Sequence, residues 1–340
     1  MRVRAAQLLY LAALVSHAPQ QPARMAAHRA PAPEGGPSLV TTEGRRTNAV
    51  GADMQHVDFH IESDVILSIR RLRGSLTPTR TGEPPRLDDN SSFILNITSA
   101  VISIDTTSLS SLLNRHVFGY RGSPLRQLHV STEGDQLVQT GVLHKLVDLP
   151  FRIHATISLT PEGDIRLHPT NVKVLGINAA GLMKLFRVRL GGLIKLQAGH
   201  GARIDQDDFI LNAAGMLPPP AMRGRLTAIR IADGRLEQTF GPSSGAETTP
   251  VHRPGSSAPN FMYFHGGMLR FGKLTMSGTD LEIVDNDPRD PFDYDPNRYN
   301  DHLVAGWSQS TIGGGLIVHM PDLKRLPARA PAASARATER

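Results

Sequence analysis

Apolar and polar side chains alternate most clearly in residues 136–177, where short turn sequences separate three runs. In the run that starts at Phe151, the side chains of Phe151, Ile153 and Ile157 share one face and polar side chains share the other. A period of two is typical of half-buried antiparallel strands. Residues 161–164 (Pro-Glu-Gly-Asp) suit a tight turn, so we expect a β-hairpin there. The apolar face of such a sheet needs a cover, which is either protein or a ligand.

Two helices are predicted to pack on this sheet. Asp105 offers a side-chain oxygen as an N-cap, and leucines follow it at helical spacing as far as Val117. Residues 178–197 form the second amphipathic pattern, with basic side chains on the face opposite the apolar one. The apolar face consists of Leu182, Phe186, Leu190, Leu193 and Ile194. A basic face of this kind fits either solvent or an anionic membrane surface.

Composition changes along the chain and predicts its organisation. Residues 1–18 combine a basic start with a short apolar run, which is typical of a signal peptide, and the run is too short to span a bilayer. We therefore expect an exported protein of the periplasm or cell envelope, with a disordered leader at residues 19–50. Behind the leader we expect a main domain, a linker, an accessory β unit and a disordered basic tail, at residues 51–240, 241–259, 260–322 and 323–340. The accessory unit either adds strands to the main sheet or packs against it.

Charge and cysteine content exclude several classes of function. The net charge of +6 comes from the ends of the chain: residues 1–50 hold six arginines against two glutamates, and residues 322–340 hold five basic against two acidic residues. The remaining residues, 51–321, have a net charge of −1, whereas a nucleic-acid-binding protein concentrates positive charge on its folded surface. The chain has no cysteine, which excludes disulfides, thiol catalysis and cysteine-ligated metals. No nucleic-acid partner is expected.

No stretch of the sequence combines a catalytic motif with its structural context. Residues 241–245 have the letters of a nucleophile elbow but lie in a linker-like segment without a following helix. His56, Asp58 and His60 would project from one face of a strand, which is metal-ligand chemistry. The same face continues as Glu62, which is what a merely solvated strand face looks like, and we favour that interpretation. We expect a protein that is not an enzyme.

The acidic segment at residues 285–301 is the most unusual local composition. Its carboxylates, of which Asp285, Asp287 and Asp290 are the metal candidates, offer the oxygen ligands that Ca²⁺ prefers. The spacing is not that of an EF-hand. The alternative, which we favour, is a polar loop whose aspartates cap turns and pair with the local arginines. Apart from this calcium candidate, no cofactor is expected.

The order of elements resembles that of the bacterial tubular lipid-binding superfamily, with the exported LmeA-type phospholipid-binding family as the closest comparison. The resemblance covers about residues 105–240 and rests on the following succession: the Leu109, Leu112, Leu113, Asn114 helix, the strands of residues 137–167, the amphipathic helix, Leu217-Pro218-Pro219, and a hairpin at Asp233-Gly234. The resemblance implies a strongly curved antiparallel sheet that wraps a long helix and leaves an apolar groove for acyl chains. Groove-lining candidates are then Phe151, Ile153, Ile157, Leu182, Phe186, Leu190 and Leu193.

The leading hypothesis is an α+β, mainly antiparallel β protein of the cell envelope that binds lipids or other amphiphiles. A phospholipid or fatty acyl ligand is expected, with peripheral membrane contact, because a curved apolar sheet face buries acyl chains through area alone, at about 25 cal/mol per Å². One alternative is a structural or protein-interaction module of the envelope that has no groove. Another is a metal-dependent hydrolase that uses the His56 or Asp285 region.

Overall fold

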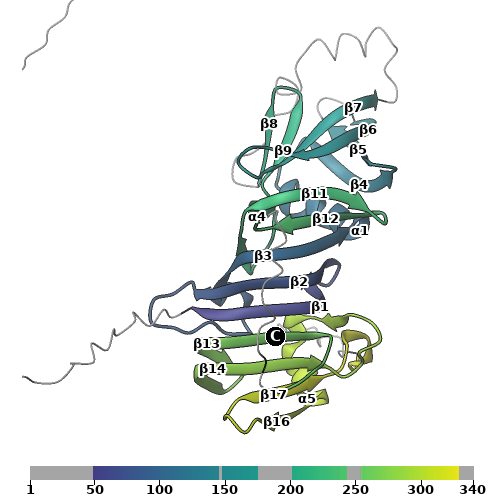
Figure 1. The fold of residues 1–340 in the computed structure, drawn as a ribbon. Helices are drawn as coiled ribbons and strands as arrows, with labels where there is room; N and C mark the ends of the chain where they lie inside the picture. Colours follow the sequence, from purple (N-terminus) through teal and green to yellow (C-terminus); the bar gives the residue numbers. More distant parts are fainter. Residues whose placement is uncertain (1–48, 145–147, 175–200, 243–252, 254, 329–340) are drawn as a thin grey trace, which may run out of the picture. The chain divides into compact units, whose positions relative to one another are not determined.

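Strands dominate the fold, as Figure 1 shows. The computed structural model describes residues 49–144, 148–174, 201–242, 253 and 255–328. Most strand pairs are antiparallel, which confirms the mainly antiparallel α+β class. Among the described residues, no helix has both the length and the apolar character required to cross a membrane.

The larger sheet has eleven strands, nine of which follow the order β11-β12-β3-β2-β1-β13-β14-β17-β16. Strands β10 and β15 complete it, pairing in parallel with β3 and β1. The strands are β1 (Val50–Glu62), β2 (Val65–Pro78), β3 (Phe93–Asp105), β10 (Ala221–Arg223), β11 (Leu226–Ala232), β12 (Arg235–Phe240), β13 (Phe261–Phe271), β14 (Leu274–Asp285), β15 (Phe292–Tyr294), β16 (Trp307–Ser310) and β17 (Leu316–Met320).

The smaller sheet has six antiparallel strands in the order β4-β5-β6-β7-β9-β8. They are β4 (Leu125–Glu133), β5 (Gln136–His144), β6 (Asp148–Leu159), β7 (Ile165–Val174), β8 (Ala202–Asp205) and β9 (Asp208–Leu211). The described helices are short: α1 (Thr106–Leu112) continues as one π-helical turn η2 (Leu113–Val117), and the others are α4 (Ala213–Met216), α5 (Tyr299–Ala305) and the 3-10 turns η1 (Asn90–Ser92), η3 (Pro296–Arg298) and η4 (Leu323–Arg325).

The hairpins form where the turn sequences predict them. Strands β6 and β7 pair in an antiparallel register that ends at Leu159 and Ile165, on either side of the predicted turn. Strands β11 and β12 are joined by Asp233 and Gly234, both of which have positive φ angles, 51° and 71°. This backbone conformation strongly favours Gly and tolerates Asp, which explains why an Asp-Gly pair occurs there.

The C-terminal strands belong to the larger sheet. Strand β13 pairs with the first half of β1, over Gly51–Gln55, and β15 pairs with its second half, over Val57–Phe59. Strands β14, β17 and β16 then extend the sheet beyond β13 (Figure 1). The segment predicted as an accessory unit thus supplies one side of the sheet that β1 and β2 begin.

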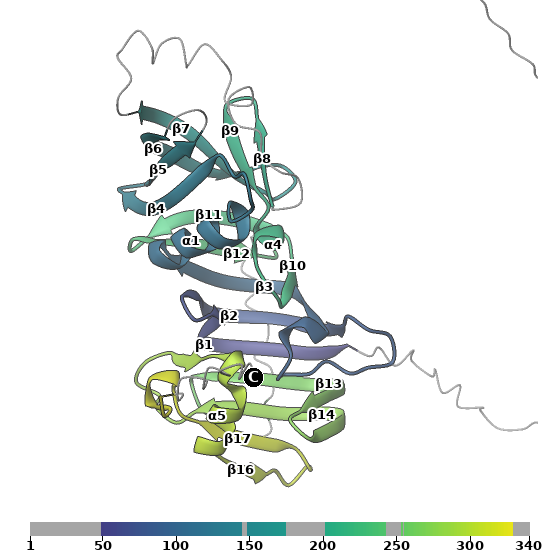
Figure 2. The same ribbon diagram turned by 180° about the vertical axis from the view of Figure 1, so that it is seen from behind.

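Helix α1 and the short α4 lie between the two sheets, as Figure 2 shows. Helix α1 begins as predicted, because the carboxylate Oδ1 of Asp105 accepts a hydrogen bond of 2.7 Å from the backbone N–H of Ser108. Its leucines Leu109 and Leu112 are buried and contact the apolar core that both sheets share. This core continues along the larger sheet to β13, β14 and β17.

Candidate functional site

An apolar cavity lies between the two sheets. Strands β2, β3 and β12 line it from the larger sheet, strands β4, β5, β6, β7 and β9 line it from the smaller one, and α1, η2 and α4 complete the wall. Among the described lining residues only Gln139 and Gln238 have polar side chains, and none is charged. The cavity has a volume of about 60 Å³, several times the roughly 10–15 Å³ that one water needs on the same measure. A space of this composition suits hydrocarbon and disfavours ions.

The alternation of β6 and β7 builds one wall of this cavity. Ile153, Ala155 and Ile157 of β6 point into it together with Ile165 and Leu167 of β7. The intervening side chains of β6 carry the charge: Arg152 pairs with Glu133, and the Nδ1 atom of its neighbour His154 lies 3.6 Å from the same carboxylate. A period of two thus separates an apolar inner face from a charged outer face.

Hydrogen bonds from polar side chains hold α1 and η2 on β4, and all three elements line the cavity. The amide of Asn114 donates to the carbonyl of Leu128 at 2.6 Å and accepts from its N–H at 2.9 Å. Leu128 lies where the register of β4 and β5 shifts, so the Asn114 side chain supplies the backbone partners that the bulge removes. The hydroxyl of Ser110 likewise accepts from the N–H of Val130 at 2.9 Å. These bonds hold α1 and η2 on β4 and thereby set the positions of the leucines in the cavity wall.

The two glutamines face the cavity from opposite sheets. Gln139 on β5 lies next to Ile153 of β6 in register, and Gln238 on β12 lies next to Ile102 of β3. Both side chains are half-buried, and no hydrogen bond joins either amide to another residue of the described part of the chain. Leu137 and Leu236, two residues earlier on the same strands, also line the cavity. The alternation along each strand therefore places the two glutamines on the same inward face as these leucines.

The predicted groove residues differ in whether they line the cavity. Ile153 and Ile157 line the cavity, as the alternation predicts. Phe151, in contrast, is buried in the shared core and does not line it. Leu182, Phe186, Leu190 and Leu193 lie outside the described residues. The two glutamines were not predicted, although a polar residue at an inward position of an alternating strand is visible in the sequence.

Two further cavities lie among the described residues. One, of about 30 Å³, is lined mainly by apolar side chains, including Ile69, which lies two residues after Leu67 on β2 and hence on the same sheet face as the first cavity. The other is more polar: Asp164 and Asn212 line it, and it shares Gln238 with the first cavity. The apolar space therefore has a polar neighbour on the side of Gln238.

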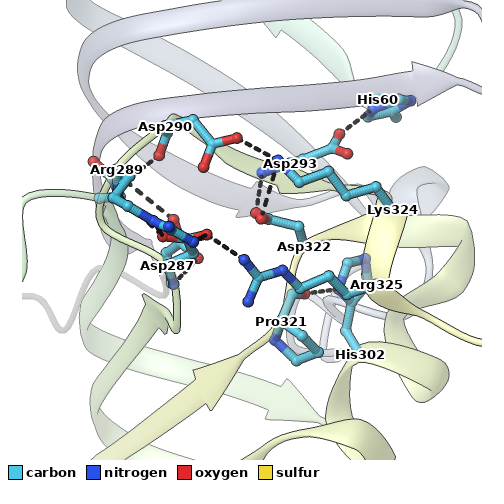
Figure 3. Close-up of polar contacts among 12 residues, drawn as sticks. His60, Asp287, Arg289, Asp290, Asp293, His302, Pro321, Asp322, Lys324 and Arg325 are labelled. Carbon is cyan, nitrogen blue, oxygen red and sulfur yellow. Dashed lines mark hydrogen bonds and ion pairs between the residues drawn. The ribbon is translucent and has the colours of Figure 1, made fainter.

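The acidic segment forms a second candidate site, shown in Figure 3. Ligand-capable oxygens of Asp287, Asp290 and Asp322 lie within 4.8 Å of one another. Asp287 and Asp290 were metal candidates in the sequence; Asp322 was not, because it comes from the segment after β17. Asp285 stands apart, with its Oδ2 accepting from the Asn260 amide at 3.0 Å, and burial raises its pKa to about 6.

Basic side chains already neutralise these three carboxylates. The Lys324 ammonium pairs with Asp290, and its Nζ lies 3.5 Å from Oδ2 of the fully buried Asp322. Arg289 and Arg325 both pair with Asp287, and the hydrogen bonds from Arg289 hold the pKa of Asp287 well below its usual range (Figure 3). This arrangement has the internal ion pairs of the predicted polar loop, with Lys324 close to two of the three carboxylates.

The expectation that the polar face of β1 is merely solvated is wrong for His60. This side chain is only 5% exposed, and its Nε2 lies 2.6 Å from Oδ1 of Asp293 in the acidic segment (Figure 3). Although burial opposes protonation of the imidazole, the hydrogen bond and charge of Asp293 outweigh it and raise the pKa of His60. His56 is exposed, so the two histidines do not share a site. The pairing with β15 buries one end of β1, which periodicity alone does not reveal.

A scan against protein-family models and searches of curated proteins and solved structures gave no match.

Proposed function

We propose that this protein binds the apolar part of an amphiphile, such as the acyl chain of a phospholipid, in the cavity between its two sheets. The observation that carries the proposal is the composition of the cavity wall: aliphatic side chains from both sheets and two helices, without a charged residue among those described. Binding sites for small molecules are commonly apolar with a few polar groups that orient the ligand.

The physical basis is the burial of hydrocarbon. Each methylene moved from water into such a space contributes about 0.8 kcal/mol, so eight methylenes supply enough free energy for a stable complex without any ion pair. A second apolar cavity, beside Ile69, lies on the same face of β2 as Leu67.

The resemblance to tubular lipid-binding proteins adds a finer proposal. In it, the predicted amphipathic helix with Leu182 and Phe186 completes the wall that Ile153 and Ile157 begin, and the sheet curves around it. Export to the cell envelope and contact with a membrane surface belong to the same proposal. What supports export is the basic, apolar and small-residue succession in residues 1–18.

The test is native mass spectrometry with lipid extraction on the full-length protein, purified without detergent. The expected result is a lipid bound at one equivalent. In the variant Ile157→Trp, the indole fills the cavity, and we expect at least a tenfold loss of bound lipid. The matched control is Ser158→Trp, because Ser158 is the exposed neighbour on the outer face of β6 and should leave binding unchanged. A lipid-free protein that also refuses added phospholipids and acyl esters overturns the proposal.

A further inference from the structure

The two glutamines indicate what kind of amphiphile the cavity accepts. Gln139 and Gln238 face an otherwise apolar space from opposite sheets, and neither amide is hydrogen-bonded to another described residue. Both side chains are half-buried, and a ligand that fills the cavity displaces water from these amides, so it either offers them a hydrogen-bond partner or leaves them unpaired at a cost in free energy. An amide is neutral, and it both donates and accepts hydrogen bonds.

The lack of charge around these amides excludes one common ligand form. A free fatty acid that places its carboxylate between Gln139 and Gln238 would bury an anion with no cation among the described lining residues. An isolated buried carboxylate is strongly disfavoured and tends to become protonated. An ester, an amide or a hydroxyl carries no charge and accepts hydrogen bonds from a glutamine side chain.

The neighbouring polar cavity gives the rest of such a ligand a place beside the apolar space. Gln238 lines both the apolar cavity and the polar one, whose wall includes Asp164 and Asn212. The carboxylate of Asp164 accepts hydrogen bonds from Asn212 at 2.8 Å and from Arg203 at 3.0 Å, so this side of Gln238 is an organised polar surface. A ligand with its hydrocarbon among the isoleucines of β6 and its polar end at Gln238 would match both spaces.

We infer that the cavity selects uncharged acyl-ester or long-chain hydroxyl compounds, whose polar group is hydrogen-bonded by Gln139 and Gln238, over alkanes and free carboxylates of the same length. This inference rests on the proposed function and specifies its ligand class.

The test compares four twelve-carbon probes, methyl dodecanoate, dodecanol, dodecane and dodecanoate, for binding to the full-length protein at pH 8 by competition with a fluorescent apolar dye. The ester and the alcohol should bind about tenfold more tightly than the alkane, as expected for one or two net hydrogen bonds, and dodecanoate should bind more weakly than the ester. In the double variant Gln139→Leu/Gln238→Leu, the advantage over dodecane should disappear while dodecane binding persists.

Gln309→Leu provides the control, since Gln309 is an exposed residue of β16 outside the three cavities. Equal binding of dodecane and the ester, tighter binding of dodecanoate than of the ester, or an unchanged preference in the double variant overturns the inference and leaves the proposed function standing. If none of the probes binds, the proposed function fails as well. The two failures are therefore distinguishable.

Discussion

The imidazole of His60 and the carboxylate of Asp293 meet at 2.6 Å, although 233 residues separate them in the chain. The contact joins β1, the first strand, to the acidic segment near the end of the larger sheet. The segment is held there by a second bond, from the N–H of Asp293 to Oδ1 of the buried Asp322, at 3.1 Å. The acidic segment is thus part of the fold's framework.

Replacing His60 by Gln should lower the free energy of unfolding and change its pH dependence. The pKa of His60 is raised in the folded state, so the pair stabilises the protein fully below the unfolded pKa of about 6.5, and this contribution is lost as the pH rises through the higher folded pKa. We expect a loss of about 1–3 kcal/mol at pH 5.5 and a smaller one at pH 8, measured by urea unfolding. Asp293→Asn should remove the same pH-dependent part. Equal losses at both pH values would contradict the assignment.

Asp285 should contribute a pH dependence of its own. Its folded pKa of about 6 lies above the unfolded value of 3.8, so the folded state binds the proton more tightly and stability falls as the pH rises from about 4 to 6. The variant Asp285→Asn should flatten this part of the stability profile. Thermal unfolding of both proteins across this range measures it. A wild-type slope retained in the variant would assign the titration to another group.

Removing the side chain of Asn114 should destabilise the wall of the cavity. In Asn114→Ala, the N–H and carbonyl of Leu128 lose their partners at the bulge, which should cost about 2–4 kcal/mol. The control is Asn171→Ala, an exposed position on β7 that should change stability by less than about 0.5 kcal/mol. If the two variants unfold at the same urea concentration, Asn114 does not anchor η2.

Lys324 should determine whether the acidic cluster responds to calcium. Millimolar CaCl₂ should leave the melting temperature of the wild-type protein unchanged, because the ammonium already lies between Asp290 and Asp322. Lys324→Met leaves these carboxylates uncompensated, so the variant should melt lower and regain several degrees with Ca²⁺. Lys273→Met, at an exposed turn, is the control. Calcium stabilisation of the wild type would instead identify a native metal site.

The local parts of this fold were predictable because they depend on neighbours in sequence. The alternation of β6 and β7, the Asp105 cap and the Asp-Gly hairpin of β11 and β12 all follow from residues within a few positions of one another. The burial of His60 was not predictable in this way, because it depends on a strand more than 200 residues away. Periodicity likewise separates the two faces of β5 but does not indicate which face lines a cavity. Gln139 was therefore not predicted as a lining residue.

The pairing of β1 with β13 also has a consequence for how the chain is made. Asp53 and His265 are neighbours across these strands but lie 212 residues apart, so one edge of β1 stays without its partner until β13 has left the ribosome. An uncovered strand edge invites association with other chains, and distant pairings form slowly. Nascent chains that end before β13 should therefore depend on chaperones, and premature termination should yield aggregates in place of a smaller folded protein.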